Sequence, residues 1–220
     1  MALVIFGAAC GQTATNNNAA LDHNSMNHNS MNHNSNMPMN SNSNVNMNHN
    51  SMNHTEMTSD TNAASAPFDL QFIDTMTHHH EGAIKMSETV LKKSANEELK
   101  QFAQKISDEQ TEEIARMKDW REKWFAEKPP SLNMEMAGMK DSMKMMAGDA
   151  MKKWEAATGK EFDLMFLEMM TEHHKGAVAM AQDALKKAEH AEIKTLARDI
   201  IKAQEDEMKK MSDWKANWSK

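Results

Sequence analysis

Apolar positions recur at helical spacing in the last two thirds of the chain. Between residues 99 and 124 a stripe of apolar positions, with polar residues at 110 and 113, follows steps of three and four: 99, 103, 106, 110, 113, 117, 120 and 124. This spacing places them on one buried stripe of a helix. A preceding helix is predicted from about residue 67 to residue 93, with Pro67 suited to an early helical position. Together the two segments predict a helical hairpin.

The hairpin is present twice. Residues 68–125 align with residues 162–219 without a gap, at an offset of 94 residues, and 24 of the 58 positions are identical. Such a repeat indicates one supersecondary unit used twice. We therefore predict an all-α four-helix bundle made of two repeated hairpins, with repeat one at 67–125 and repeat two at 158–220. A Met-rich crossover, 126–157, joins them.

Local signals predict where the helices begin and end. Two capping boxes mark predicted helix starts: Ser94 with Glu97, and Thr158 with Glu161. Pro129 and Pro130 end the second helix. The crossover is expected to form a loop and then one short helix from about Asp141.

The first third of the chain lacks the helical pattern. From residue 11 to about residue 66 there is no Lys or Arg, almost no branched aliphatic residue, and an excess of Asn, Ser, His and Met. This composition predicts a disordered segment, because too little apolar surface can be buried to offset the ordering entropy. Residues 67–220 are long enough for one domain. The net charge of −7 argues against a nucleic-acid partner.

Residues 1–10 resemble the end of a bacterial lipoprotein signal. A short apolar run with small residues precedes Cys10, which would be lipidated after cleavage. The run has no basic start, carries Gly7 where Leu is usual, and is too short to span a membrane. We therefore expect a periplasmic or extracytoplasmic protein that meets the membrane only through a lipid anchor. The alternative is a chance apolar start on a cytosolic protein.

Polar residues interrupt the buried stripe at equivalent places in both hairpins. Folding the first hairpin about residue 95 brings position 80 level with position 110 and position 76 level with position 114. Each hairpin then contributes one slab near its midpoint: Met76, His79, His80, Gln110, Glu113 and Met117, and Met170, His173, His174, Gln204, Glu207 and Met211. Adjacent helical residues point about 100° apart, so one histidine of each pair should face the axis and the other a neighbouring helix. His78, whose counterpart is Glu172, is expected to face solvent.

Buried His, Gln and Glu side chains need partners. They either form a structural hydrogen-bond network or hold a metal ion, with Glu as a ligand or as the acceptor of an imidazole N–H. The interleaved methionines favour a soft ion, Cu(I) or by the same softness Ag(I). Three other methionines, at 165, 169 and 208, are interpreted as core residues, and the Trp pairs 120/124 and 214/218 as packing.

The N-terminal segment repeats the same donor types without a helical pattern. Imidazoles and thioethers alternate at short intervals: His23, Met26, His28, Met31, His33, Met47, His49, Met52, His54 and Met57. A flexible chain with this spacing could wrap Cu(I) or Ag(I). The alternative is a low-complexity polar spacer.

At "FDLQFIDTMTHHHEGAIKM", "QTEEIARMKDW" and their copies, the chain resembles the bacterial family known as domain of unknown function 305. That family is ferritin-like in fold and includes CopM-type periplasmic copper-binding and copper-resistance proteins. The resemblance covers residues 67–220, leaves the N-terminal segment outside the family core, and implies a four-helix bundle, export and copper homeostasis. The residues to which it points are Met76, His79, His80, Met86, Met170, His173, His174 and Met180.

The sequence thus predicts an exported copper-binding protein, not an enzyme, that sequesters Cu(I) or hands it to a copper exporter or another periplasmic copper protein. One alternative is a ferritin-like di-iron or copper oxidase. A di-iron bundle needs Glu-x-x-His on two helices, whereas Thr77 and Met170 stand three residues before His80 and His173. The other alternative is a structural or signalling helical module with a buried polar network, which does not explain the N-terminal segment.

Overall fold

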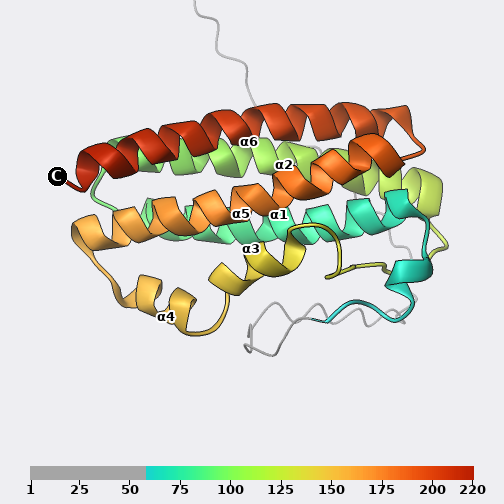
Figure 1. Ribbon diagram of the computed structural model, residues 1–220, viewed down its shortest axis with the longest axis horizontal. Coiled ribbons are helices and arrows are strands. Elements are labelled where there is room, and N and C mark those ends of the chain that lie inside the picture. Colours follow the sequence, from blue (N-terminus) through green and yellow to red (C-terminus); the bar gives the residue numbers. More distant parts are fainter. Residues whose placement is uncertain (1–57) are drawn as a thin grey trace, which may run out of the picture. The chain divides into compact units, whose positions relative to one another are not determined.

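The computed structural model describes residues 58–220, so Cys10 and the predicted N-terminal ligands, His23 to Met57, lie outside the described residues. Four long helices form the predicted all-α bundle of two hairpins (Figure 1): α1 (Phe68–Lys93), α2 (Glu97–Phe125), α5 (Gly159–Lys187) and α6 (Ala191–Trp218). A 3₁₀ turn, Ala63–Ser65, precedes α1. No helix within residues 58–220 has both the length and the apolar content that a membrane crossing requires.

The two hairpins are joined through aspartates that occupy equivalent positions. Asp69, at the start of α1, accepts hydrogen bonds from the backbone N–H groups of Glu189 (3.0 Å) and His190 (2.8 Å) in the α5–α6 turn. Asp163, at the start of α5, accepts one from the Ser94 hydroxyl (2.7 Å) in the α1–α2 turn. The start of each first helix is therefore tied to the turn of the other hairpin, which makes α1 and α5 antiparallel.

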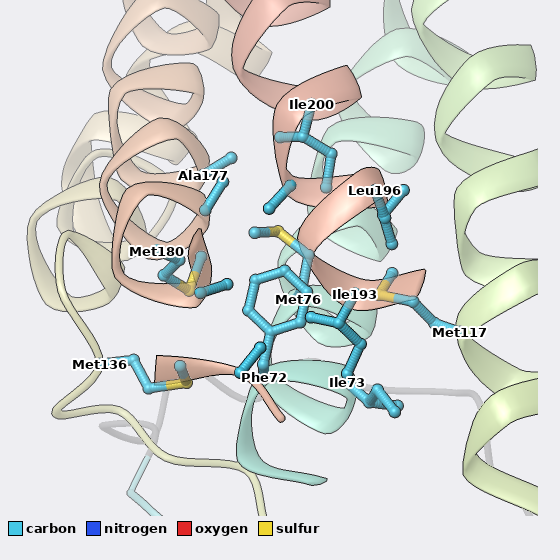
Figure 2. Packing of buried hydrophobic residues seen from close by; sticks show 14 of the residues in the cluster. Phe72, Ile73, Met76, Met117, Met136, Ala177, Met180, Ile193, Leu196 and Ile200 are labelled. Carbon is cyan, nitrogen blue, oxygen red and sulfur yellow. The ribbon is translucent and has the colours of Figure 1, made fainter. Parts of the chain in front are cut away.

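Apolar packing forms two clusters, each with side chains from all four long helices. The first cluster includes Phe72, Ile73, Met76, Ile114, Met117, Ala177, Met180, Ile193, Leu196 and Ile200 (Figure 2). The second cluster includes Met86, Val90, Leu99, Phe102, Ile106, Phe166, Leu167, Met170, Met211 and Trp214. Because every helix contributes to both clusters, neither hairpin has a core of its own. The apolar area buried between hairpins is what holds them together.

The tryptophan pairs pack as predicted. Trp120 stacks on Trp124, with ring centroids 5.5 Å apart, and both pack against the first cluster. Trp214 stacks on Trp218 at 5.0 Å and lies in the second cluster.

Neither of the two predicted capping boxes forms. The N-cap of α2 is Asn96, whose side chain accepts from the N–H groups of Glu98 (3.0 Å) and Leu99 (3.1 Å). Ser94 is instead engaged by Asp163 from the other hairpin. Thr158 is the N-cap of α5 as predicted, but its side chain makes no capping hydrogen bond.

The crossover contains two short helices, α3 (Met139–Met145) and α4 (Gly148–Ala156), where the sequence predicted one. Both pack against α5. The loop before α3 is tied to the chain that precedes α1, because Leu132 exchanges hydrogen bonds with Asp60 and the Met134 N–H donates to Ser59 (2.9 Å). The structured part therefore begins N-terminal to the predicted boundary at residue 66.

The two repeated glycines both face the crossover helix α3. A Cβ on Gly176 would lie 2.6 Å from the Ser142 side chain and 2.8 Å from the backbone oxygen of Gly138, the residue that begins α3 with a φ of +77°. A Cβ on Gly82 would lie 2.8 Å from the terminal methyl of Met146 and 3.6 Å from Nε2 of His173. The glycine at each position lets α3 approach the bundle closely.

We expect Gly176→Ala to lower the free energy of unfolding by about 1–3 kcal/mol, because the backbone of α3 has to move away. Gly82→Ala is the matched control. There only a flexible methionine tip has to move, and Ala is favoured over Gly in a helix by up to about 1 kcal/mol. Urea denaturation followed by far-UV circular dichroism measures both. Equal stability of the two variants would contradict the close contact of α3 with α5.

Candidate metal centre

The four histidines of the repeated pairs form one buried layer between the two apolar clusters. His79, His80, His173 and His174 are all 0% exposed. The rings of His79 and His173 meet across the α1–α5 contact, with centroids 3.6 Å apart and planes inclined by 31°. His80 and His174 turn instead towards the second helix of their own hairpin. This is the division within each pair that the 100° helical step predicted.

His80 and His174 each donate a hydrogen bond to a carboxylate. Nε2 of His80 lies 2.7 Å from Oε2 of Glu113 on α2, and Nε2 of His174 lies 2.8 Å from Oε2 of Glu207 on α6. A carboxylate only accepts hydrogen bonds, so Nε2 carries the hydrogen in both rings.

His79 and His173 also carry their hydrogen on Nε2. His173 donates from Nε2 to the backbone oxygen of His79 (2.9 Å). Nε2 of His79 lies 3.1 Å from Oγ of Ser142, and the Ser142 hydroxyl itself donates to the backbone oxygen of Met139 (2.9 Å). Because that hydroxyl hydrogen is already used, Oγ of Ser142 accepts from His79.

The four Nδ1 atoms, in contrast, make no hydrogen bond within the described bundle. Among residues 58–220 they are buried and have no hydrogen-bond partner. The same holds for both amide atoms of Gln110 and for Oε1 of Gln204. Burial lowers the pKa of His79 and of His173 well below the usual value of an imidazole, and neighbouring histidines lower both further. Both rings are thus neutral near pH 7, with the Nδ1 lone pair available to a ligand.

Two sets of buried thioethers flank the histidine layer. Met76, Met117 and Met180, from α1, α2 and α5, point into the first cluster in Figure 2. The equivalent set in the second cluster is Met86, Met170 and Met211. All six are 0 or 1% exposed. The antiparallel contact of α1 with α5 thus places Met180 with Met76 and Met86 with Met170, so each set contains methionines from both hairpins.

A threonine hydroxyl lies beside one sulfur in each set. Oγ1 of Thr77 is 4.0 Å from Sδ of Met117, and Oγ1 of Thr171 is 3.9 Å from Sδ of Met211. The repeated arrangement therefore extends beyond the histidines to the residues that surround the sulfur atoms.

The candidate metal ligands combine nitrogen and sulfur donors. Within residues 58–220, no three side chains of His, Cys, Asp and Glu are grouped so that they could hold a metal ion. Glu113 and Glu207 contact the Nε2 side of the rings, opposite the free Nδ1 atoms, so of the two roles predicted for them the geometry matches that of the imidazole N–H acceptor. The remaining donors are imidazole Nδ1 atoms and thioethers, a set that suits soft cations.

The two halves of the layer differ in charge. Nζ of Lys105 lies 2.8 Å from Oε1 of Glu207, whereas the position equivalent to Lys105 in the second hairpin is Asp199. Burial alone would raise the pKa of Glu207, but the hydrogen bond from His174 and the charge of Lys105 together lower it. The Glu113 side chain is 15% exposed and the Glu207 side chain 6%. Neither Lys105 nor Ser142 was predicted as a neighbour of the histidines.

His78 does not face solvent freely. It is half-buried, and its desolvation lowers the pKa of the ring. The prediction of a solvated side chain therefore holds only in part.

Comparisons with known proteins place these observations in a family. A family model described as "Domain of unknown function (DUF305)" matches residues 11–121 and 69–215. The first match begins at residue 11, so it includes the His/Met/Asn-rich segment that was expected to lie outside the family core. None of the curated proteins compared with the chain matches it.

Three solved structures are similar over the bundle. A DUF305 protein from Streptomyces coelicolor, assigned as secreted, is 32% identical with a TM-score of 0.60, over 72% of this chain and 95% of that one. CopM in its Cu(II)-bound form is 37% identical with a TM-score of 0.58, over 68% and 97% of the two chains. CopM in its Cu(I)-bound form is 35% identical with a TM-score of 0.56, over 68% and 96%. CopM has also been crystallised with Ag.

We expect the metal-free bundle to lose stability below about pH 6.5, the usual pKa of an imidazole. The pKa values of His79 and His173 are lowered on folding, so below pH 6.5 the unfolded chain binds protons that the folded bundle does not. The contribution of these histidines to the free energy of unfolding is therefore fully present above this pH. It falls as the pH drops, by up to about 1.4 kcal/mol per pH unit for each histidine. Urea denaturation at a series of pH values measures the slope.

The control for this titration is His173→Asn, which keeps a polar side chain but removes one titrating group. Its slope should be smaller than that of the unaltered protein, with His79 and His78 still contributing. An unfolding free energy that does not change between neutral pH and about pH 5 would contradict neutral burial of these rings.

Proposed function

Because the chain belongs to the DUF305 family, we propose that it is an exported copper-binding protein that holds Cu(I), or Ag(I), with histidine and methionine side chains of its bundle. Similar structures of CopM were determined with Cu(I), Cu(II) and Ag, which supports a metal as the cargo. The role is sequestration or transfer in copper homeostasis.

The observation that supports the proposal most strongly is the set of four buried Nδ1 atoms without hydrogen-bond partners. A purely structural network would satisfy both ring nitrogens, because an unsatisfied buried acceptor costs about 1–3 kcal/mol. Here only Nε2 is satisfied, by a carboxylate, a carbonyl or a hydroxyl. Ligating histidines typically have this arrangement, in which the outer partner fixes the tautomer and the ring orientation.

The equivalent positions of the two hairpins supply equivalent candidate donors. His80 with Met76 and Met117 would serve one half, and His174 with Met170 and Met211 the other. Met180 and Met86 extend the two sets, and His79 and His173 lie between them. Neutral imidazoles and thioethers suit a monovalent soft ion, because they bring no charge into a dry site.

The geometry supports binding over oxidation chemistry. Carboxylate-bridged di-iron sites need several inward-facing glutamates. In the described bundle Glu113 and Glu207 accept hydrogen bonds from His80 and His174, and Lys105 also contacts Glu207. These carboxylates are therefore already engaged on the outer side of the imidazoles.

Export and the N-terminal segment complete the proposal. The apolar residues 1–10 and Cys10 favour a lipid-anchored extracytoplasmic protein, and the secreted assignment of the Streptomyces coelicolor relative supports export. The His/Met pairs of residues 23–57 would hold further Cu(I). A copper exporter or another periplasmic copper protein is the candidate partner for transfer.

We expect the double variant Met76→Leu, Met170→Leu to bind Cu(I) in the bundle at least about tenfold more weakly, a loss of roughly 1.4 kcal/mol or more. Leu keeps the volume of Met but removes the sulfur, so the fold should be kept. Met169→Leu is the matched control, since Met169 is buried in the second cluster but has Thr75 as its counterpart. Competition with a coloured Cu(I) chelator measures all three proteins. If both variants compete as well as the unaltered chain, the bundle is not the site.

The N-terminal segment is tested separately. Replacing every His and Met of residues 23–57 by Asn and Leu should reduce the number of Cu(I) ions bound per chain, while the tightest class of sites keeps its affinity. Deletion of residues 11–57 should give the same result, and the substituted chain controls for length. An unchanged number of bound ions would show that these residues hold no copper.

A further inference from the structure

The donors of the candidate site are closed off from solvent, so a metal ion has to pass a covering element. The four histidines and the six flanking methionines are 0 or 1% exposed. The covering element at the contact between α1 and α5 is α3, and its Ser142 accepts the hydrogen bond from His79. Both repeated glycines lie under this cover. The way α3 contacts each glycine therefore bears on how an ion reaches the layer.

The two glycine contacts differ in rigidity. At Gly176 the contact atoms belong to the Ser142 side chain and the backbone oxygen of Gly138, so this side is sealed by the main chain of α3. At Gly82 the nearest crossover atoms are the terminal methyl and Sδ of Met146, at 2.8 and 3.7 Å from the position of a Cβ. A methionine tip has three rotatable bonds and moves readily, whereas a backbone segment does not. The contact between the crossover and the bundle is therefore least rigid at Gly82.

The movable side chain at this place is itself a soft ligand. Met146 follows the last residue of α3 and is partly exposed, and its thioether lies against the bundle at Gly82. The same Cβ position on Gly82 is 3.6 Å from Nε2 of His173, so the sulfur lies next to the histidine layer.

Thioethers also connect this place to the second cluster. Those packed against it and partly exposed are Met145, Met146, Met151, Met165 and Met208, whereas the corresponding residue for the first cluster is Met143. Partly exposed methionines are thus more numerous on the side of the histidine layer that holds buried Met170 and Met211.

We propose that Met146 is the first bundle ligand of incoming Cu(I) and passes it, through the gap left by Gly82, to the buried histidine and methionine donors. The step is a ligand exchange: the Met146 sulfur binds the ion, a buried donor binds it in turn, and the Met146 sulfur leaves. Copper stays Cu(I) throughout, and the step changes only which donors are bound to it. The inference rests on the proposed function.

The test uses the full-length chain with the His and Met residues of 23–57 replaced, so that only the bundle takes up metal. Stopped-flow transfer of Cu(I) from a coloured chelator gives the loading rate, and the end point gives the bound amount. Met146→Leu should load about tenfold more slowly, because the transition state for entry no longer has a sulfur bound to the ion, with an end point within about twofold of the parent chain. Met145→Leu, one residue away and packed against the same cluster, is the control and should load within about twofold of the parent rate.

A second variant keeps the sulfur but displaces it. Gly82→Ala places a methyl where the Met146 tip lies, so it should also slow loading, and combining it with Met146→Leu should add little. Three outcomes overturn the proposal: Met146→Leu loads at the parent rate, Met145→Leu is slowed equally, or Met146→Leu lowers the end point without changing the rate. Failure of the proposed function would appear elsewhere, as a parent chain that takes no Cu(I) from the chelator.

Discussion

The contact between α1 and α5 at His79 and His173 is the interaction on which the rest of the site depends. Two imidazole rings 3.6 Å apart can be buried together only while both are neutral, because a charged ring would lose its hydration beside another dipole. The hydrogen bond from His173 to the His79 carbonyl fixes the register of the two antiparallel helices. That register brings Met180 beside the Met76 set and Met86 beside the Met170 set.

The repeat and the buried stripe were enough to predict the bundle and the histidine layer, because both follow from helical periodicity. Predictions failed where a tertiary partner decided the outcome. Ser94 fits a capping box locally, yet Asp163 from the other hairpin engages its hydroxyl, so Asn96 caps α2. The crossover occurs once, so no second copy indicated where α3 would lie. The repetition of glycine at positions 82 and 176 was the only sequence signal that the crossover passes close to them.

Duplication gives the two halves the same donors but not the same surroundings. His174 and Glu207 are joined by Lys105, which has no equivalent beside Glu113. The crossover adds a second difference, because Ser142 accepts from His79, whereas the backbone oxygen of His79 accepts from His173. The four Nε2–H groups thus donate to different acceptors. The acceptor on Nε2 influences the basicity of Nδ1, the candidate ligating nitrogen of the same ring. Sites that look equivalent in the sequence therefore need not bind an ion with equal strength.

The Nδ1 atoms without partners would couple binding of the proposed ion to the stability of the fold. Each buried acceptor left without a partner costs about 1–3 kcal/mol, and a folded domain is stable by only about 5–15 kcal/mol in total. Four such atoms on adjacent rings are a substantial fraction of that margin. The two large apolar clusters offset this cost while the site is metal-free. An ion that binds these nitrogens in the folded state but not in the unfolded chain then adds its binding free energy to the stability of the bundle.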